Sequence, residues 1–338
     1  MTTKAYFKRR ALLTGALGMV TTAFLPALPI MRVAAEPLSL PPYPTRPVKW
    51  IVPYTAGGAT DVISRLICQR LSERLGQSFL VVNEPGAGST VGTELVINSA
   101  PDGYTLLLTS TANAINASFD KSLAFDFAKA IVPVAGLARI PLVMVINTVI
   151  PARTIPEFVA YAKSNPGRLS FGSSGVGTSL HLSGELFKTM TGTDLVHVPY
   201  KGSAPALFDL MSGQIQAMFD NVTSSAPLVR DGKVRALGVT TRERSVSLPD
   251  VPPISDSLPG YETSSFYGVG APRATAPAVV DLLNREINLA LEDPQIRRQL
   301  DDLGAIPITG NATQFAAMMA AETERWRKIV EASGAKKD

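Results

Sequence analysis

Hydrophobic residues recur at every fourth position in the segment DVISRLICQRLSERLG, residues 61–76. This spacing places them on one face of a helix, and Gly76 has the residue type that commonly follows a helix end. Short apolar runs flank the segment, VKWIVPY before it and SFLVVN after it. Runs of this length and composition predict strands. The pattern therefore predicts a strand–helix–strand unit.

The same alternation continues along the chain. Further strands are expected in PDGYTLLLTS, RLSFGSS, DLVHVPY, IQAMFDN, VRALGVTT and SSFYGVGAP. Helices are expected in STVGTELVINSA, with Ser89 or Thr90 as N-cap, in TIPEFVAYAKSNPG, TSLHLSGELFKTMTG and ALFDLMSGQ, and in the three last amphipathic runs. Thr154 and Glu157 form a capping-box pattern at the start of one of them. The repeating order predicts an α/β fold whose mainly parallel sheet is covered by helices on both faces.

Residues 1–35 have the composition of an export signal. The basic run MTTKAYFKRR precedes an apolar stretch, and Val33 and Ala35 provide the small residues of a cleavage site. We expect cleavage near Ala35, and the Arg9–Arg10 pair favours the twin-arginine route. An uncleaved membrane anchor is the alternative, because the apolar stretch is almost long enough to span a bilayer.

Charge and composition exclude several functional classes. Removing the five basic residues of the signal from the 32 in the chain leaves 27, against 28 acidic residues. Such a balance gives no reason to expect nucleic acid as a partner. The chain has one cysteine, Cys68, which we expect to be a packed thiol, and two histidines. With so few ligating residues, we expect no metal site and no cofactor.

Five loops at the ends of predicted strands share one composition. They are TAGGAT after the first strand, TANA, GSSGVGTS, KGSA and NVTSS. The carboxyl ends of parallel strands form the usual ligand site of such sheets. Small hydroxyl and glycine residues there offer main-chain N–H groups and helix N-termini, and only Lys201 and Asp220 add charge. This equipment suits an anion such as a carboxylate.

The sequence contains near matches to two catalytic motifs, but neither motif is complete. The loop GSSGVGTS has the glycine spacing of a P-loop, but Thr178 stands where that motif needs lysine. A nucleophile elbow centred on Ser174 would need a second glycine where Val176 stands. We expect no catalytic residue, and a secreted hydrolase that uses Ser174 with His181 or Lys201 is the rival from another class.

Several residues near these loops have two interpretations. His181 falls in the first turn of the helix opened by Thr178, and it can reach a ligand or bond locally. His197 alternates with valines and is expected to be structural. Lys201 is either a solvated lysine or the cation near the ligand, and Asp220 either meets a ligand hydroxyl or amine or caps the next segment. Asp61 is expected to be the N-cap of the first helix.

The chain resembles a known family over nearly all of the mature sequence. The segments that carry the resemblance are IVPYTAGGATDVISRLICQRLSERLGQ, VVNEPGAGSTVGTELV, SAPDGYTLL, SFGSSGVGTSLHLSGELFK, HVPYKGSAPALFDLMSGQI and LPDVPPISD. They are similar to the Bug, or TctC-type, solute-binding receptors of tripartite tricarboxylate transporters. The resemblance implies a periplasmic binding protein of type II, in which two α/β lobes with mixed, mainly parallel sheets are joined by two crossover strands.

The resemblance also implies a binding site and its boundaries. Two loops would hold one carboxylate of the ligand, and further residues would line the rest of the cleft. The implied ligand-binding residues are Tyr54, Ala56, Gly57, Gly58, Asp61, Ser110, Ser173, Ser174, Gly175, Gly177, Thr178, His181, Tyr200, Lys201 and Asp220. Lobe one would comprise residues 45–140 and 265–338, and lobe two residues 141–264.

The family implies a functional context as well. We expect a periplasmic monomer that captures a small carboxylate and delivers it to integral membrane subunits of a transporter. The same receptor reporting its ligand to a sensor kinase is the alternative. Di- and tricarboxylates, acidic amino acids, nicotinate and aromatic carboxylates all stay open as ligands.

Overall fold

The computed structural model describes residues 42–335, and the expected export signal lies outside the described residues. They belong to the unit Pro42–Asp338. The strands are β1 (Val48–Val52), β2 (Phe79–Asn83), β3 (Thr105–Ser110), β4 (Ile131–Ile146), β5 (Leu169–Ser173), β6 (Leu195–Pro199), β7 (Ala217–Asn221), β8 (Arg235–Val239), β9 (Ser264–Pro272) and β10 (Ile306–Pro307).

Helices connect most of these strands, as the hydrophobic pattern predicts. They are α1 (Ala59–Leu75), α2 (Thr90–Ile97), α3 (Thr111–Phe119), α4 (Phe127–Ala130), α5 (Ile155–Lys163), α6 (Ser179–Thr191), α7 (Ser203–Ser212), α8 (Val222–Arg230), α9 (Pro277–Glu292), α10 (Pro294–Asp302) and α11 (Ala312–Ser333). Two short 3₁₀ helices, η1 (Ala87–Ser89) and η2 (Ile254–Asp256), complete the described elements.

The strands form one mixed sheet in the order β2-β1-β3-β9-β4-β7-β5-β6, and β8 and β10 also pair with β4. Among the named strands, β1 pairs in parallel with β2 and β3, and β5 pairs in parallel with β6 and β7. Every pairing made by β4 or β9 is antiparallel. The sheet is therefore more mixed than the strand–helix order suggests, because that order indicates local neighbours and not the strands that return from far along the chain.

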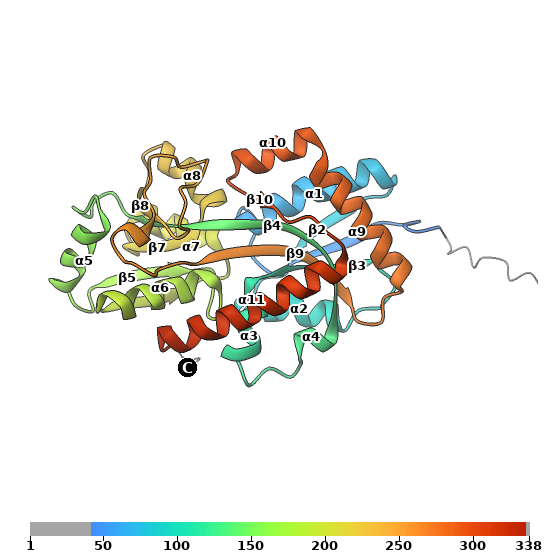
Figure 1. Ribbon diagram of the computed structural model, residues 1–338, viewed down its shortest axis with the longest axis horizontal. Coiled ribbons are helices and arrows are strands. Elements are labelled where there is room, and N and C mark those ends of the chain that lie inside the picture. Colours follow the sequence, from blue (N-terminus) through green and yellow to red (C-terminus); the bar gives the residue numbers. More distant parts are fainter. Residues whose placement is uncertain (1–41, 336–338) are drawn as a thin grey trace, which may run out of the picture. The chain divides into compact units, whose positions relative to one another are not determined.

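Two long strands run between two groups of parallel strands (Figure 1). The first group is β1, β2 and β3, and the second group is β5, β6 and β7. Strand β4 pairs with β9 as far as Pro141, opposite Ser264, and from Leu142 onward it pairs with β7. The mixed α/β fold with crossover strands agrees with the predicted fold class. The exact lobe boundaries stay a prediction.

Local signals explain where several helices begin and end. Gly76 adopts a left-handed conformation directly after α1, as expected. The Thr154 side chain caps α5 by accepting a hydrogen bond from the Glu157 N–H, and Ser89 is the N-cap position of α2. The prediction that Asp61 caps α1 is wrong, because the N-cap is Gly58 and Asp61 is the third helical residue.

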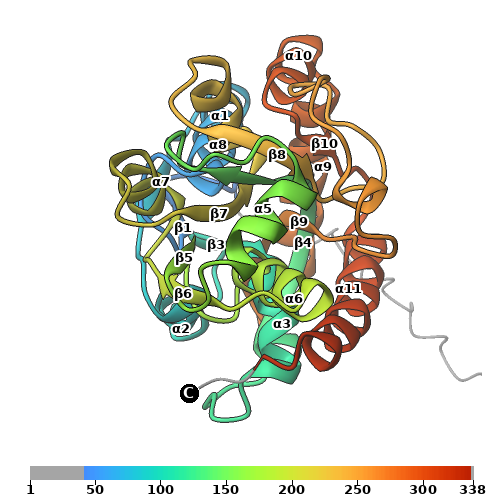
Figure 2. The same cartoon turned by 90° about the vertical axis from the view of Figure 1, so that its left-hand side faces the viewer.

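The last helix, α11, contacts helices that follow strands of both groups. It packs against β4, α3 and α6, and Figures 1 and 2 show it beside α6. Trp326 of α11 is fully buried in a cluster with Ile115 and Phe119 of α3 and Leu182 of α6. Arg139 of β4 links α11 to β9. Its guanidinium group donates to the Ser264 Oγ at 3.0 Å and to the Glu322 carboxylate at 2.8 Å.

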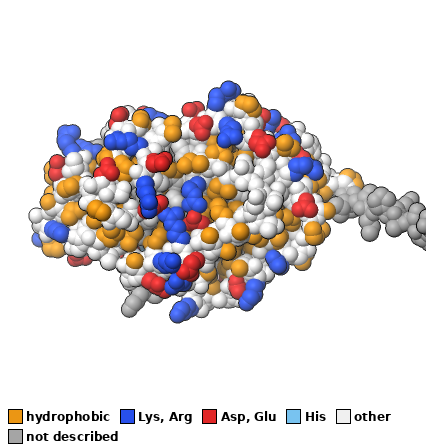
Figure 3. Space-filling model, viewed as in Figure 1, with side chains coloured by type: hydrophobic (Ala, Val, Ile, Leu, Met, Phe, Trp, Pro, Cys, Tyr) orange, Lys and Arg blue, Asp and Glu red, His pale blue; other side chains and the backbone are white. Residues whose placement is uncertain are grey.

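Charges of both signs are interspersed on the face of the molecule shown in Figure 3. Ion pairs among the described residues include Arg139 with Glu322 and Arg242 with Glu262. On this face the distribution agrees with the nearly balanced charge of the mature sequence. Among the described residues, no helix combines the length and the apolar character that a membrane span requires.

Candidate ligand-binding site

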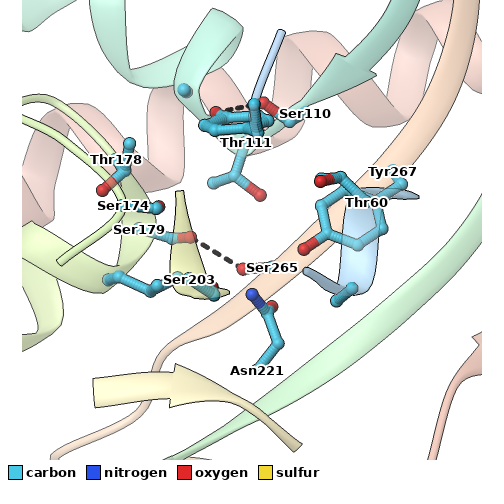
Figure 4. A pocket seen from close by; sticks show the side chains of 14 residues that line it. Thr60, Ser110, Thr111, Ser174, Thr178, Ser179, Ser203, Asn221, Ser265 and Tyr267 are labelled. Atoms are coloured by element: carbon cyan, nitrogen blue, oxygen red, sulfur yellow. Dashed lines mark hydrogen bonds between the residues drawn. The ribbon is translucent and has the colours of Figure 1, made fainter. Parts of the chain in front are cut away.

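A small cavity lies between the two strand groups, close to β9 (Figure 4). Its volume is about 20 Å³, which is on the scale of one or two water molecules. None of the described residues that line it is charged. They are Tyr54, Ala59, Thr60, Ser110, Thr111, Ala112, Ser174, Thr178, Ser179, Leu180, Ser203, Asn221, Ser265 and Tyr267.

The lining residues come from the starts of helices. Thr60 belongs to the first turn of α1, Thr111 opens α3, Ser179 opens α6 and Ser203 opens α7. Asn221 is the N-cap residue of α8. Five helix N-termini therefore converge on one cavity. Because each helix carries a partial positive charge at its N-terminus, the cavity favours an anion without a cationic side chain.

The loop after β1 is ordered by Asp61. Its carboxylate accepts the Gly57 N–H at 3.0 Å and pairs with Arg65 at 2.9 Å. It also accepts a hydrogen bond from the Asn83 side chain at 3.1 Å. Burial alone would raise the pKa of Asp61, but these hydrogen bonds outweigh it and the pKa is lowered. Asp61 is thus ionised and holds the loop, and it is not among the residues that line the cavity.

The loop after β5 is ordered by uncharged groups. The Ser173 Oγ accepts the Gly175 N–H at 3.1 Å and lies 2.7 Å from the His197 Nε2. The Thr178 hydroxyl donates to the Gly175 carbonyl at 2.7 Å. At the other end of the loop, the Gly177 N–H donates to the Nδ1 of His181 at 3.3 Å.

The two histidines support this second loop together. The rings of His181 and His197 stack with their centroids 4.1 Å apart. Burial, together with the nearby charges of His181 and Lys188, lowers the pKa of His197 to about 3. His197 is therefore neutral at physiological pH. His181 accepts a local hydrogen bond and is not among the residues that line the cavity, and its contact with a ligand stays a prediction.

Hydroxyl groups provide the polar surface of the cavity itself. The Tyr54 and Ser110 oxygens lie 3.1 Å apart, and the Ser179 and Ser265 oxygens lie 2.7 Å apart. Burial raises the pKa of Tyr54 and of Tyr267, so both phenols keep their protons and can donate hydrogen bonds. The Asn221 Oδ1 is buried and has no hydrogen-bond partner among the described residues, so the site also contains a free acceptor.

Asp220 lies directly behind this surface. It is fully buried and accepts hydrogen bonds from the hydroxyls of Ser203 at 2.6 Å and Ser225 at 2.7 Å. Burial raises the pKa of Asp220 to about 6, and the hydrogen bonds from Ser203 and Ser225 reduce the shift. Through Ser203, the protonation state of Asp220 influences the cavity without a direct contact.

The residues predicted from the sequence thus take four kinds of position. Tyr54, Ser110, Ser174 and Thr178 line the cavity. Gly58, Asp61, Ser173, Gly177, His181 and Asp220 support the loops and helices around it. Ala56 and Gly57 are exposed. Gly175, Tyr200 and Lys201 line a separate outer pocket of about 290 Å³.

Several lining residues were not singled out from the sequence. Thr60, Thr111, Ser179, Ser203 and Asn221 belong to the five small-residue loops, so their helix-opening positions were available as a signal. Ser265 and Tyr267 lie in the middle of β9, which pairs with β3 and β4. No local pattern in the sequence places that strand beside the loops.

Comparison with known proteins decides the family. A model of the family described as "Tripartite tricarboxylate transporter family receptor", TctC, matches residues 63–335. The chain belongs to this family. The resemblance seen in the sequence is thereby confirmed, and TctC family members are solute-binding receptors.

Curated relatives of this TctC receptor cover most of its length. A protein encoded in the tcbD-tcbE intergenic region of Pseudomonas sp. (strain P51) is 38% identical over 306 residues, which cover 90% of this chain and 91% of the relative. The protein BugT of Bordetella pertussis is 36% identical over 305 residues, which cover 89% of this chain and 94% of BugT.

Solved structures of similar proteins include carboxylate complexes. Rpa4515 of R. palustris with adipate is 38% identical, with a TM-score of 0.84 over 86% of this chain and 98% of that one. MatC of Rhodopseudomonas palustris with bound malate is 32% identical, with a TM-score of 0.82 over 85% of this chain and 100% of MatC. The periplasmic binding protein BugD is 31% identical, with a TM-score of 0.84 over 88% of this chain and 100% of BugD.

In this TctC receptor, Ser173 and Ser174 differ in the two features that a serine nucleophile needs. Ser174 lines the cavity but has no hydrogen bond to a histidine among the described contacts. Ser173 does contact His197, yet its side chain is fully buried and does not line the cavity. A nucleophile needs both an adjacent base and access to substrate, and here the two requirements fall on different serines.

Proposed function

We propose that this receptor binds a small carboxylate-bearing solute in the cavity between the strand groups. The observation that carries the proposal is the convergence of five helix N-termini on a surface of uncharged hydroxyl groups. Each N-terminus favours negative charge by about 0.3–1 kcal/mol at an exposed site and by more when partly buried. A carboxylate can accept several such donors at once.

Closure of the two groups would couple binding to a change of shape. Direct hydrogen bonds already link the groups, because the Thr55 N–H donates to the Lys201 carbonyl at 3.2 Å and the Ala59 N–H donates to the Ser224 Oγ at 3.2 Å. A ligand that contacts α1 and α6 together gains both sets of contacts only when the groups are close. Binding therefore favours the closed arrangement.

The family and its neighbours support the wider context. The receptor would act in the periplasm as a monomer, after cleavage near Ala35, and hand its ligand to the membrane subunits of a tripartite transporter. It would carry out no chemical reaction on the ligand. Residues 45–140 with 265–338 would form one lobe and residues 141–264 the other, with the crossover near Pro141 and Ser264.

The ligand class follows from the neighbours and from the cavity. Adipate and malate are bound by two similar receptors, so dicarboxylates of four to six carbons are the first candidates. A ligand of this size exceeds the described cavity of about 20 Å³, so the two groups would stand further apart around it. The free Asn221 Oδ1 would accept a hydrogen bond from a hydroxyl or ammonium group of the ligand.

A thermal-shift screen tests the proposal. The panel contains malate, adipate, citrate, glutamate, nicotinate and benzoate, each beside its amide or ester. We expect at least one free acid to raise the Tm in a concentration-dependent way, whereas its uncharged analogue does not. Stabilisation by neutral analogues alone would contradict the proposal. Turnover of an ester, lost in Ser174→Ala, would favour the hydrolase instead.

Thr178 and Thr154 provide a matched pair of variants for this screen. Each threonine caps a helix by accepting an N–H at 3.3 Å, but Thr178 lines the cavity and Thr154 is remote from it. Loss of the cap should cost each valine variant about 1 kcal/mol of stability, and Thr178→Val should cost about 1 kcal/mol more because its hydrogen bond to the Gly175 carbonyl is also lost. Only Thr178→Val should lose the ligand-induced shift. Equal shifts in both variants would refute the placement of the site.

A further inference from the structure

The two strand groups meet main chain to main chain on two sides of the cavity. On one side, Gly88 of η1 lies against the loop Gly175–Gly177 of the second group. On the other side, Thr55 lies against Gly202, and the Thr55 N–H donates to the Lys201 carbonyl. Both contacts depend on a residue without a side chain.

At the first contact, there is no space for a methyl group. A Cβ on Gly88 would overlap the carbonyl oxygen of Val176, and a Cβ on Gly175 would lie 3.2 Å from the Gly88 Cα. The Cβ and the Val176 oxygen would have to move apart by about 1 Å to reach 3.4 Å, where ordinary van der Waals contact begins. The obstacle is a backbone carbonyl, which cannot rotate away as a flexible side chain can.

The second contact is also close, but its nearest atom belongs to a side chain. A Cβ on Gly202 would overlap the hydroxyl of Thr55 and would lie 3.0 Å from the Thr55 backbone nitrogen. Gly202 has an extended conformation with φ of 162°, which any residue adopts. The need for glycine there is therefore a need for space alone.

Other glycines in the chain show what a purely conformational role looks like. Gly192 has φ of +64° at the end of α6, close to the +58° of Gly88, but a Cβ there would meet nothing within 4 Å. The two positions carry the same backbone requirement and differ in whether another group faces them. Gly88 and Gly202 thus define how closely the strand groups can approach.

We infer that Gly88 and Gly202 set the closest approach of the two strand groups and thereby the length of the carboxylate ligand that the closed cavity accepts. The inference rests on the proposed function. The retreat that alanine imposes is comparable to one carbon–carbon bond, ~1.5 Å. A ligand with one additional methylene group would span the widened gap, whereas a shorter ligand would lose contact with one of the two groups.

Titration calorimetry with the linear dicarboxylates from malonate to pimelate tests this inference. The proteins are the wild type, Gly88→Ala, Gly202→Ala and the control Gly192→Ala. In the first two variants the ratio of affinities for the longer over the shorter acids should rise about tenfold. Gly192→Ala should lose a similar amount of stability from its positive φ, without a change in that ratio. A loss that is uniform across acid lengths, or the same ratio change in Gly192→Ala, would overturn the inference.

Hydrogen exchange tests the same inference without a ligand. The Thr55 N–H bonds across the two groups, so its exchange reports their contact. We expect it to exchange about tenfold faster in Gly88→Ala and Gly202→Ala than in the wild type or in Gly192→Ala. Thr55→Ala combined with Gly202→Ala should restore part of the protection, because the overlapping hydroxyl is removed. Unchanged exchange in both alanine variants would overturn the inference, whereas failure of every acid to bind the wild type would contradict the proposed function alone.

Discussion

The loops after β1 and β5 present helix N-termini from opposite sides of the cavity, but different forces hold them in place (Figure 4). The first is ordered by an ionised carboxylate, because Asp61 accepts the Gly57 N–H and pairs with Arg65. The second is ordered by neutral groups, Ser173 and Thr178, with His181 and His197 stacked behind them.

The difference shows how a site for an anion can be built without charging its own surface. Asp61 is turned away from the cavity and neutralised by Arg65, so its charge orders the loop without repelling a carboxylate. Around the second loop a cation would attract the ligand, yet the chain uses the stacked rings of His181 and His197, of which His197 stays neutral. The two loops should therefore respond differently to substitution, acid and salt.

Removal of the Asp61 carboxylate should have the largest effect. In Asp61→Ala the loop at Gly57 loses a charge-assisted acceptor, and we expect a loss of about 2–3 kcal/mol in the free energy of unfolding. Ligand binding should weaken together with it. Urea denaturation and calorimetry measure the two effects. The control Asp126→Ala removes an exposed cap of α4 and should cost no more than about 1 kcal/mol.

Ser173→Ala should have a smaller effect of the same kind. The variant loses the hydrogen bond from the Gly175 N–H and the contact with His197, which are bonds between neutral groups worth about 1 kcal/mol. Denaturation curves measure the change, and Ser164→Ala at an exposed position serves as control. A loss in Ser173→Ala as large as that in Asp61→Ala would remove the contrast between the two loops.

Mild acid should weaken the second loop before the first. The pKa of His197 is depressed to about 3 in the fold, so the unfolded chain binds more protons below its ordinary value of 6.5. Stability from His197 is complete above pH 6.5 and decreases as the pH falls towards 3. Asp61 has a lowered pKa, so its contribution is complete above its ordinary value of 3.8 and is lost only below it.

His197→Gln isolates this acid effect, because glutamine keeps a hydrogen-bonding group but does not titrate. The protection factors of the Gly175 and Gly177 amides should fall between pH 6.5 and 4.5 in the wild type and much less in the variant. Asp220 acts in the opposite direction, because its pKa is raised to about 6 and its ionisation destabilises the fold as the pH rises from 3.8 to 6. Equal pH dependence in both proteins would contradict the assignment.

Arg65→Met should have the smallest effect. The Arg65 side chain is 55% exposed, and exposed ion pairs contribute about 0–1 kcal/mol. We expect a loss of less than about 1 kcal/mol, which should shrink further in high salt because the pair is screened. Denaturation at low and high ionic strength measures this. A salt-independent loss would show that Arg65 acts through packing.

Local patterns predicted the parts of the fold that depend on neighbours in sequence. The four-residue spacing from Ile63 to Leu75 and the glycine-rich turns identified α1 and the loops around the cavity. The N-cap of α1 was misplaced at Asp61, because a glycine at the true cap leaves no side-chain signal and Asp61 acts from within the helix.

The rest of the site depends on pairing between distant segments. Ser265 and Tyr267 reach the cavity because β9 returns to lie between β3 and β4, an arrangement that strand–helix alternation does not encode. Tyr200 and Lys201 follow a strand end, as predicted, but they line the outer pocket. Helix α3 went unpredicted because TANAINASF lacks a clear apolar period.

The position of α11 has a consequence for the order of folding. Trp326 fills a space bounded by α3 and α6, which are contributed by segments far earlier in the chain. A growing polypeptide therefore lacks this wedge until its C-terminal part has been synthesised, and the surfaces of Ile115 and Leu182 stay uncovered until then. Such long-range contacts slow folding, so this part of the core is completed only after α11 has been synthesised.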